Sequence, residues 1–179
     1  MGGGVVLNCH DVVQLPPCFS LACDPMTIIR HAAFPDDIAF VLDIWREFIA
    51  SSPVNLDYQS NDAEFATLPG KYAAPGGCVL LADRDGGIEG CIAFRVVDAD
   101  ICEMKRLYVR PDARGRNLGH RLVERLIEEA RRVGYREMRL DVQAKSVSAR
   151  RLYSAFGFVA AEPISFNPVP GASFLGRHL

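Results

Sequence analysis

Residues 110–122 read RPDARGRNLGHRL and place four arginines, one histidine and two glycines directly before a long helical pattern. A helix N-terminus exposes about four unpaired backbone N–H groups and a partial positive charge. Gly115 and Gly119 let a ligand approach the main chain closely, because neither residue has a Cβ. The stretch therefore predicts an anion site where a strand hands over to a helix. The alternative is an ordinary capped helix with a solvated arginine face.

The segments on both sides of this turn have the periodicity of one α/β unit. Apolar residues keep helical spacing over 118–133, and Gly134 is the expected stop. The preceding strand, ICEMKRLYV at 101–109, carries three charges, which a strand serving only the core rarely does. The sequence also predicts a hairpin in which strands 78–83 and 88–97 are joined by a turn at 85–87. Further strands are expected at 26–31, 136–142, 158–162 and 172–179. Further helices are expected from 36 to before 53, over 61–68 and over 148–156.

Length and composition fit a single globular domain. The chain has 179 residues, of which 49% are hydrophobic and 23% charged. No apolar run approaches the roughly 20 residues needed to cross a bilayer, so no membrane association is expected. Residues 1–25 lack the basic start and unbroken apolar run of a signal peptide, which predicts a cytoplasmic protein. We assign 1–25 to an N-terminal extension, either an ordered arm or a disordered tail, and 26–179 to the domain.

Six cysteines lie at positions 9, 18, 23, 78, 91 and 102, without the close pairs that build zinc sites. Buried thiols are therefore expected, and no metal is predicted.

The charges divide unevenly along the chain. Residues 1–102 hold 5 Lys and Arg against 14 Asp and Glu, whereas 103–151 hold 14 against 7, so the two parts carry −9 and +7. This division suits an anionic ligand on one side and a cationic one on the other, although solvated helix faces explain it equally well. A nucleic-acid role is not favoured, because the arginines surround one amphipathic helix without a stacking-aromatic motif.

The motif RGRNLG resembles the acyl-CoA signature of the GNAT-superfamily N-acetyltransferases, in which Arg or Gln, two residues, Gly, one residue, then Gly or Ala hold the pyrophosphate of coenzyme A. EMKRLYVRP before it and SARRLYSAFGF at 148–158 stand in the family's order, and the likeness covers roughly 27–179. The resemblance implies a single α/β (α+β) domain with a mixed, mostly antiparallel sheet of about six or seven strands flanked by helices.

The resemblance also implies a site for acetyl-CoA as acyl donor. Asn117 replaces the first signature glycine, which is tolerable because Asn enters the left-handed region readily. Ser146 stands where many members have an Asn that contacts the pantetheine arm; capping the following helix is its other interpretation. The implied donor-binding residues are Leu107, Tyr108, Val109, Arg114, Gly115, Arg116, Asn117, Leu118, Gly119, His120 and Ser146.

Acyl transfer to an amine requires loss of a proton, because an alkyl ammonium with a pKa near ~10.4 is almost wholly protonated at pH 7. Glu103 lies where some family members place a carboxylate base, but it could equally pair with Lys105, two positions along the strand. Tyr153 matches the tyrosine that protonates the departing thiolate in much of the superfamily; packing in the core is the alternative.

The resemblance implies an N-acetyltransferase that passes acetyl directly from acetyl-CoA to a small amine or to an amine of a peptide or protein. The alternatives are a non-catalytic acyl-CoA sensing module and an acyltransferase acting on a non-amine acceptor. The acceptor is expected near 55–59 and 166–170, and sheet edges could pair two copies into a homodimer.

Overall fold

The computed structural model describes residues 26–52, 54 and 61–179 of the chain. Residues 1–25, and with them the expected N-terminal extension, lie outside this part. The elements are β1 (Ile28–His31), α1 (Ile38–Ala50), α2 (Asn61–Ala66), β2 (Cys78–Arg84), β3 (Gly87–Val96), β4 (Ile101–Val109), α3 (Leu118–Val133), β5 (Glu137–Val142), α4 (Val147–Ala155), β6 (Val159–Ala160) and β7 (Ser173–His178).

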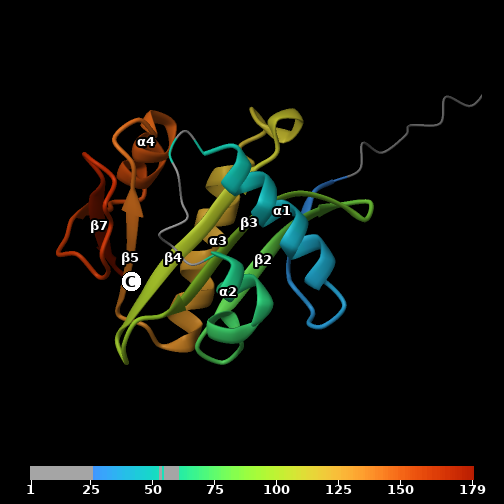
Figure 1. Ribbon diagram of the computed structural model, residues 1–179, viewed down its shortest axis with the longest axis horizontal. Helices are drawn as coiled ribbons and strands as arrows, with labels where there is room; N and C mark the ends of the chain where they lie inside the picture. Colours follow the sequence, from blue (N-terminus) through green and yellow to red (C-terminus); the bar gives the residue numbers. More distant parts are fainter. Residues whose placement is uncertain (1–25, 53, 55–60) are drawn as a thin grey trace, which may run out of the picture.

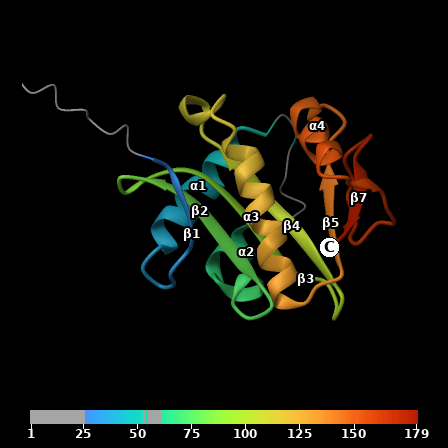
Figure 2. The ribbon, with the colours of Figure 1, turned by 180° about the vertical axis from the view of Figure 1, so that it is seen from behind.

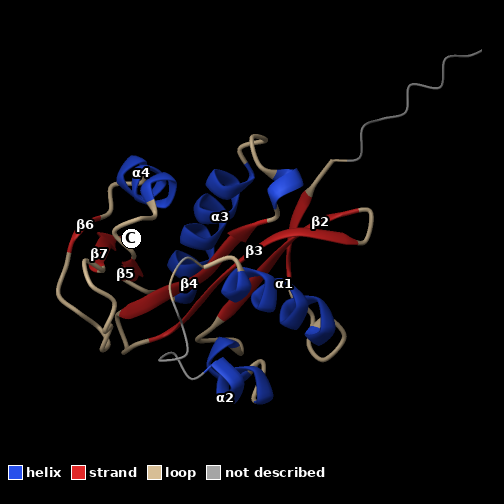
Figure 3. Cartoon of the chain, turned by 45° about the horizontal axis from the view of Figure 1, so that its top comes forward, coloured by secondary structure: helices blue, strands red, loops and turns tan. Residues whose placement is uncertain are grey.

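The strands form one seven-stranded sheet in the order β1-β2-β3-β4-β5-β7-β6. All neighbours pair antiparallel except β4 and β5, which are parallel. Helices α1 and α2 lie on the front face in Figure 1, while α3 crosses the opposite face in Figure 2. Helix α4 lies beside β5, β6 and β7 (Figure 3). The predicted single mixed, mostly antiparallel sheet flanked by helices is confirmed.

Each face of the sheet has its own hydrophobic core. The apolar stripe of α3 supplies the larger core, in which Leu122, Val123 and Leu126 are fully buried. On the other face, Val41, Ile44 and Trp45 of α1 are fully buried against β2 and β3. Burial of such side chains stabilises the fold by about 1.5–3 kcal/mol each. The sheet is therefore held from both sides, and β4 is fixed at its centre.

Strand β4 contains a β-bulge at Arg106, which has a φ of 60°. The register with β3 skips one position between Cys91 and Ala93, so β4 has an extra residue there. Up to this point side chains alternate between the faces, with Met104 on the α3 face. The bulge directs Arg106 toward α1 and α2, and it returns Leu107 to the α3 face. One short strand thus sends several charged side chains to the α1 and α2 side.

The predicted elements agree closely with the observed ones. Strand 101–109 and helix 118–133 have the expected bounds, and Gly134 ends α3 with a φ of 104°. The strand predicted at 158–162 is shorter than expected, because only Val159 and Ala160 are in register with β7. In the described residues, no helix is long and apolar enough to cross a membrane.

Three of the six cysteines lie in the described residues, and all three are buried free thiols. Burial raises the pKa of Cys78, Cys91 and Cys102 to about 12 in each case. A thiol with such a pKa holds its proton at neutral pH and is a poor nucleophile. The expectation of buried thiols is therefore confirmed for these three residues.

Candidate functional site

The main cavity lies where β4 and β5 separate. The two strands pair only between Ile101–Glu103 and Glu137–Arg139. Beyond these residues both strands continue without pairing to each other, and a cavity of about 850 Å³ opens between Met104–Val109 and Leu140–Gln143. The main-chain groups of two strands that would otherwise bond each other are thus left for a ligand.

One end of this cavity is closed by the N-terminus of α3. Asn117 precedes the helix in the left-handed conformation, with φ 58° and ψ 17°, and its side chain makes no capping hydrogen bond. The expected left-handed backbone at this signature position is therefore confirmed. Gly115 has a φ of 81°, which favours glycine. Leu118, Gly119 and His120 line the cavity, so the first amides of α3 border it.

The predicted arginines of this turn differ in where they point. Arg114 lines the cavity, and its Nε donates a hydrogen bond to the carbonyl of Val109 at 3.0 Å. Arg116 does not line it, because its guanidinium pairs with Glu89 Oε1 at 2.8 Å. Direct contact of the Arg116 side chain with a ligand in the cavity would require this ion pair to open.

Tyr153 lies both in the core and on the wall of the main cavity. It lies on α4, is 7% exposed and belongs to the α3-side core, where its ring contacts Phe158. It also lines the cavity. Burial, and to a smaller extent the charge of Asp141, raises the pKa of Tyr153 well above its ordinary value. The phenol therefore keeps its proton at neutral pH and can serve as a hydrogen-bond donor.

Two further predicted residues lie on the cavity wall. Ser146 occupies the N-cap position of α4, but its side chain makes no capping hydrogen bond, so the capping interpretation is wrong. Ser146 lines the cavity instead. The ring of His120 lies 4.4 Å from that of Phe156, which places the imidazole at the cavity edge between α3 and the end of α4.

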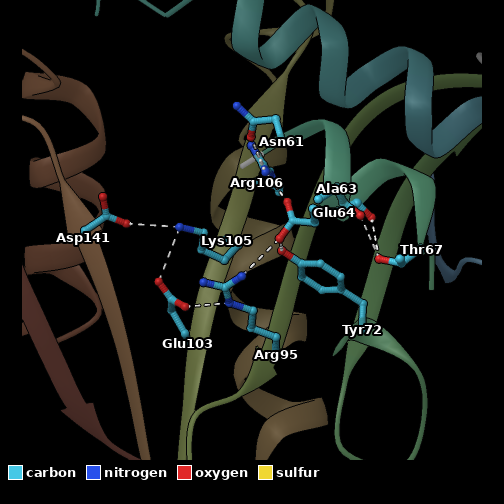
Figure 4. A network of polar contacts seen from close by, with 10 residues as sticks. All are labelled: Asn61, Ala63, Glu64, Thr67, Tyr72, Arg95, Glu103, Lys105, Arg106 and Asp141. Atoms are coloured by element: carbon cyan, nitrogen blue, oxygen red, sulfur yellow. Dashed lines mark hydrogen bonds and ion pairs between the residues drawn. The ribbon is translucent and has the colours of Figure 1, made fainter. Parts of the chain in front are cut away.

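Glu103 forms ion pairs and lines no described cavity. Its Oε2 accepts a hydrogen bond from Arg95 Nε at 2.7 Å, and its Oε1 lies 3.4 Å from Lys105 Nζ (Figure 4). Only 3% of the side chain is exposed. The predicted ion pair with Lys105 is therefore present.

The ion pairs of Glu103 belong to a chain of alternating charges that crosses the sheet face from β5 to α2 (Figure 4). Lys105 Nζ lies 3.6 Å from Asp141 Oδ1 on β5. At the other end, Glu64 of α2 accepts hydrogen bonds from Arg95, Arg106 and the Tyr72 hydroxyl. Although burial alone would raise it, the pKa of Glu64 is lowered by these partners, above all by Arg106.

Arg106 closes this chain inside the α1-side core. Its side chain is 1% exposed, and its guanidinium carbon lies 5.2 Å from the ring centre of Trp45 and 5.8 Å from those of Phe48 and Phe65. Three aromatic faces can stabilise a desolvated cation. Nη2 also donates to Asn61 Oδ1 at 2.8 Å. Arg106 thereby connects β4 to both α1 and α2.

A second, smaller pocket of about 140 Å³ adjoins the charge chain. Three residues, Lys105, Arg106 and Asp141, line this pocket as well as the main cavity. Phe166 of the expected acceptor segment lines it too, whereas 55–59 falls outside the described residues. Sequence reasoning missed Asp141, although an aspartate between Leu140 and Val142 in a predicted strand was a usable signal.

Comparison with known proteins agrees with this geometry. Residues 40–158 match the model of the acetyltransferase (GNAT) family. An uncharacterized N-acetyltransferase of Schizosaccharomyces pombe is 37% identical over 149 residues, which cover 82% of this chain and 91% of that protein. An N-acetyltransferase of Thermoplasma acidophilum, solved in complex with coenzyme A, has a TM-score of 0.68 at 17% identity, covering 86% of this chain and 99% of the other.

A GNAT-family acetyltransferase of Staphylococcus aureus has the same fold, with a TM-score of 0.71 at 19% identity, and covers 86% of this chain and 99% of its own. The family uses acetyl-CoA, and both the opened strand pair and the uncapped start of α3 fit such a ligand. The chain belongs to the GNAT family of acetyltransferases, and it is an acyltransferase enzyme.

Proposed function

We propose that this enzyme transfers acetyl directly from acetyl-CoA to an amine. The observation that supports this most is the single cavity that joins the uncapped α3 start to the separated strands, with the buried phenol of Tyr153 on its wall. No covalent acyl-enzyme is needed, because both reactants can meet in one cavity.

In this proposal, the donor is held by groups of three kinds. The amides that begin α3 at Leu118, Gly119 and His120 and the side chain of Arg114 receive the pyrophosphate. The side of β4 at 107–109 that does not pair with β5 binds the pantetheine amides and offers an N–H to the thioester oxygen. Ser146 contributes a hydroxyl whose hydrogen-bonding capacity no helix cap consumes.

Tyr153 is the proposed general acid. When the C–S bond of the thioester breaks, the departing thiolate must be protonated or hydrogen-bonded. A phenol whose pKa is raised by burial stays protonated before this step. Because no described residue donates or accepts a hydrogen bond at the Tyr153 hydroxyl, the group is free to point at the sulfur.

Glu103 is the proposed second catalytic residue, but its position limits how it can act. Its carboxylate is buried between Arg95 and Lys105. These cations lie against both of its oxygens, and Glu103 does not line the main cavity. Glu103 would therefore receive a proton only through a relay, for which Lys105 and a water are the nearest means.

Tyr153→Phe tests the acid role. The variant should lower kcat by about 10²- to 10⁴-fold, the usual contribution of a positioned acid, while coenzyme A binding measured by calorimetry stays close to wild type. Free-thiol release follows turnover. An unchanged kcat would refute the assignment, and a loss of coenzyme A binding would show that the phenol acts in packing.

The same experiments separate the two alternatives. An acyl-CoA sensing module would bind coenzyme A tightly yet release no thiol with any member of a broad amine panel. An acyltransferase with a non-amine acceptor would release thiol with alcohols or thiols but not with amines. The buried phenol on the cavity wall favours a catalytic protein over a sensor.

A further inference from the structure

Asp141 is the carboxylate of this site that has an oxygen without a hydrogen bond and also lines a cavity. Glu64 accepts hydrogen bonds from three side chains, and Glu103, whose Oε1 also lacks a hydrogen-bond partner, is buried against two cations and lines neither cavity. Asp141 lines both cavities and accepts one hydrogen bond from a described residue, on Oδ2. Its Oδ1 lies 3.6 Å from Lys105 Nζ, beyond hydrogen-bond distance. Oδ1 is thus available to a donor from a ligand.

Asp141 lies on the boundary between the two hollows of the site. It lines both the main cavity, whose wall includes Tyr153, and the smaller pocket beside Phe166. A carboxylate on this boundary can touch a molecule that enters the small pocket and reaches toward the thioester. Glu103, which lines neither, cannot.

The orientation of the Asp141 carboxylate is fixed from the acceptor segment. Asn167 Nδ2 donates to Asp141 Oδ2 at 2.8 Å, and Asn167 Oδ1 accepts the Val169 N–H at 2.9 Å. Because the amide oxygen is engaged by a backbone donor, the amide nitrogen faces the carboxylate. Asn167 is therefore a positioning residue. It holds Oδ2 of Asp141 and leaves Oδ1 of Asp141 for a ligand.

From these contacts we propose that Asp141 binds the ammonium group of the acceptor and removes its proton, so that the acceptor is an amine that arrives as a cation. This proposal rests on the proposed function. Lys105 assists, since its charge beside the bound ammonium lowers the pKa of the amine and favours release of the proton. Glu103 holds Lys105 in this position.

One proton passes from the ammonium to Asp141, and the freed nitrogen lone pair forms a bond to the thioester carbon. When the C–S bond breaks, the sulfur takes the proton of Tyr153. The second proton lost by nitrogen restores the phenol, and Asp141 releases its proton to water. One amide, one free thiol and one proton result.

The test compares acceptors that differ in protonation. A panel of primary alkylamines and amino acids is screened with wild type by thiol release, and the best acceptor is paired with methoxyamine, which is unprotonated at neutral pH. Asp141→Asn, which retains an acceptor for Asn167, should lower kcat/KM for the alkylammonium by about 100-fold or more but for methoxyamine by less than about 10-fold. Asn167→Ala should show the same selectivity, more weakly.

Glu103→Gln is the matched comparison, and melting temperatures and coenzyme A binding check that each variant is folded. Glu103→Gln should lower kcat/KM for the alkylammonium by less than Asp141→Asn does and should change kcat/KM for methoxyamine little, because Glu103 acts only by holding Lys105. Equal losses on both acceptors in Asp141→Asn, or selectivity confined to Glu103→Gln, would overturn the assignment while leaving amine transfer intact. Wild type that acetylates no amine of the panel would instead refute the proposed function itself, and the assignment with it.

Discussion

Replacing Arg106 with methionine should destabilise the protein by about 2–3 kcal/mol. Removing one partner of a buried ion pair costs about 3–5 kcal/mol when the other charge is left alone. Glu64 retains Arg95 at 3.1 Å and the Tyr72 hydroxyl at 2.8 Å, which places the cost below that range. Methionine also removes Nε and Nη1, two buried donors with no hydrogen-bond partner, and it fills the same space between the aromatic rings.

The assay is urea unfolding followed by the fluorescence of Trp45, the single tryptophan of the chain, which lies against the substituted side chain. Arg46→Met is the control, because Arg46 forms a pair with Asp43 at 3.7 Å in which the two side chains are 63% and 67% exposed. Such a pair is worth about 0.2–1 kcal/mol. Arg106→Met combined with Glu64→Gln should cost at least about 1 kcal/mol less than the sum of the single variants.

Two results would refute this reasoning. If Arg106→Met and Arg46→Met cost the same, the aromatic surroundings and burial of Arg106 contribute nothing. If the costs of Arg106→Met and Glu64→Gln are additive, the two side chains are not coupled, and their ion pair does not contribute to the free energy of unfolding.

Two further variants test other features of the site. The pKa of Glu64 is lowered in the folded protein. Its ionised form therefore stabilises the fold at pH values above its ordinary pKa of 4.5, and this contribution is lost as the pH falls through the folded pKa. The stability difference between wild type and Glu64→Gln should therefore shrink below about pH 4.5 in acid unfolding curves; a constant difference would contradict it. Because the Ser146 hydroxyl caps no helix, Ser146→Ala should change the free energy of unfolding by less than about 0.5 kcal/mol. The same variant should weaken coenzyme A binding in calorimetry. A loss of stability near 1 kcal/mol would instead support the capping role.

The sequence predicted the fold well because its strongest signals are local. The apolar stripe of α3, the glycine that ends it and the turn before β3 each depend on residues a few positions apart. The motif residues at 114–119 other than Arg116 lie on one cavity with Tyr153 for the same reason, since each is close to the start or on the face of a predicted helix.

The charged half of the site could not be predicted in the same way. The bulge that turns Arg106 toward α1 arises from the register of β3, and no local pattern encodes it. Asp141 meets Lys105 only because β4 and β5 are neighbours, and it meets Asn167 because the chain returns from β6. The partner of Arg116, Glu89, lies 27 residues away on another strand. Such pairings require the tertiary arrangement.

The short pairing of β4 with β5 has a mechanical consequence. Only three residues of each strand are in register, so the sheet has two halves that are joined by this short pairing alone. One half contains β1 to β4, and the other contains β5, β7 and β6. A ligand whose amides bond to the free edge of β4 and whose other side contacts β5 and α4 connects the two halves where the strands do not pair. Donor binding would then restrict the motion of one half relative to the other and fix the distance between Tyr153 and the centre of β4 before any acceptor arrives.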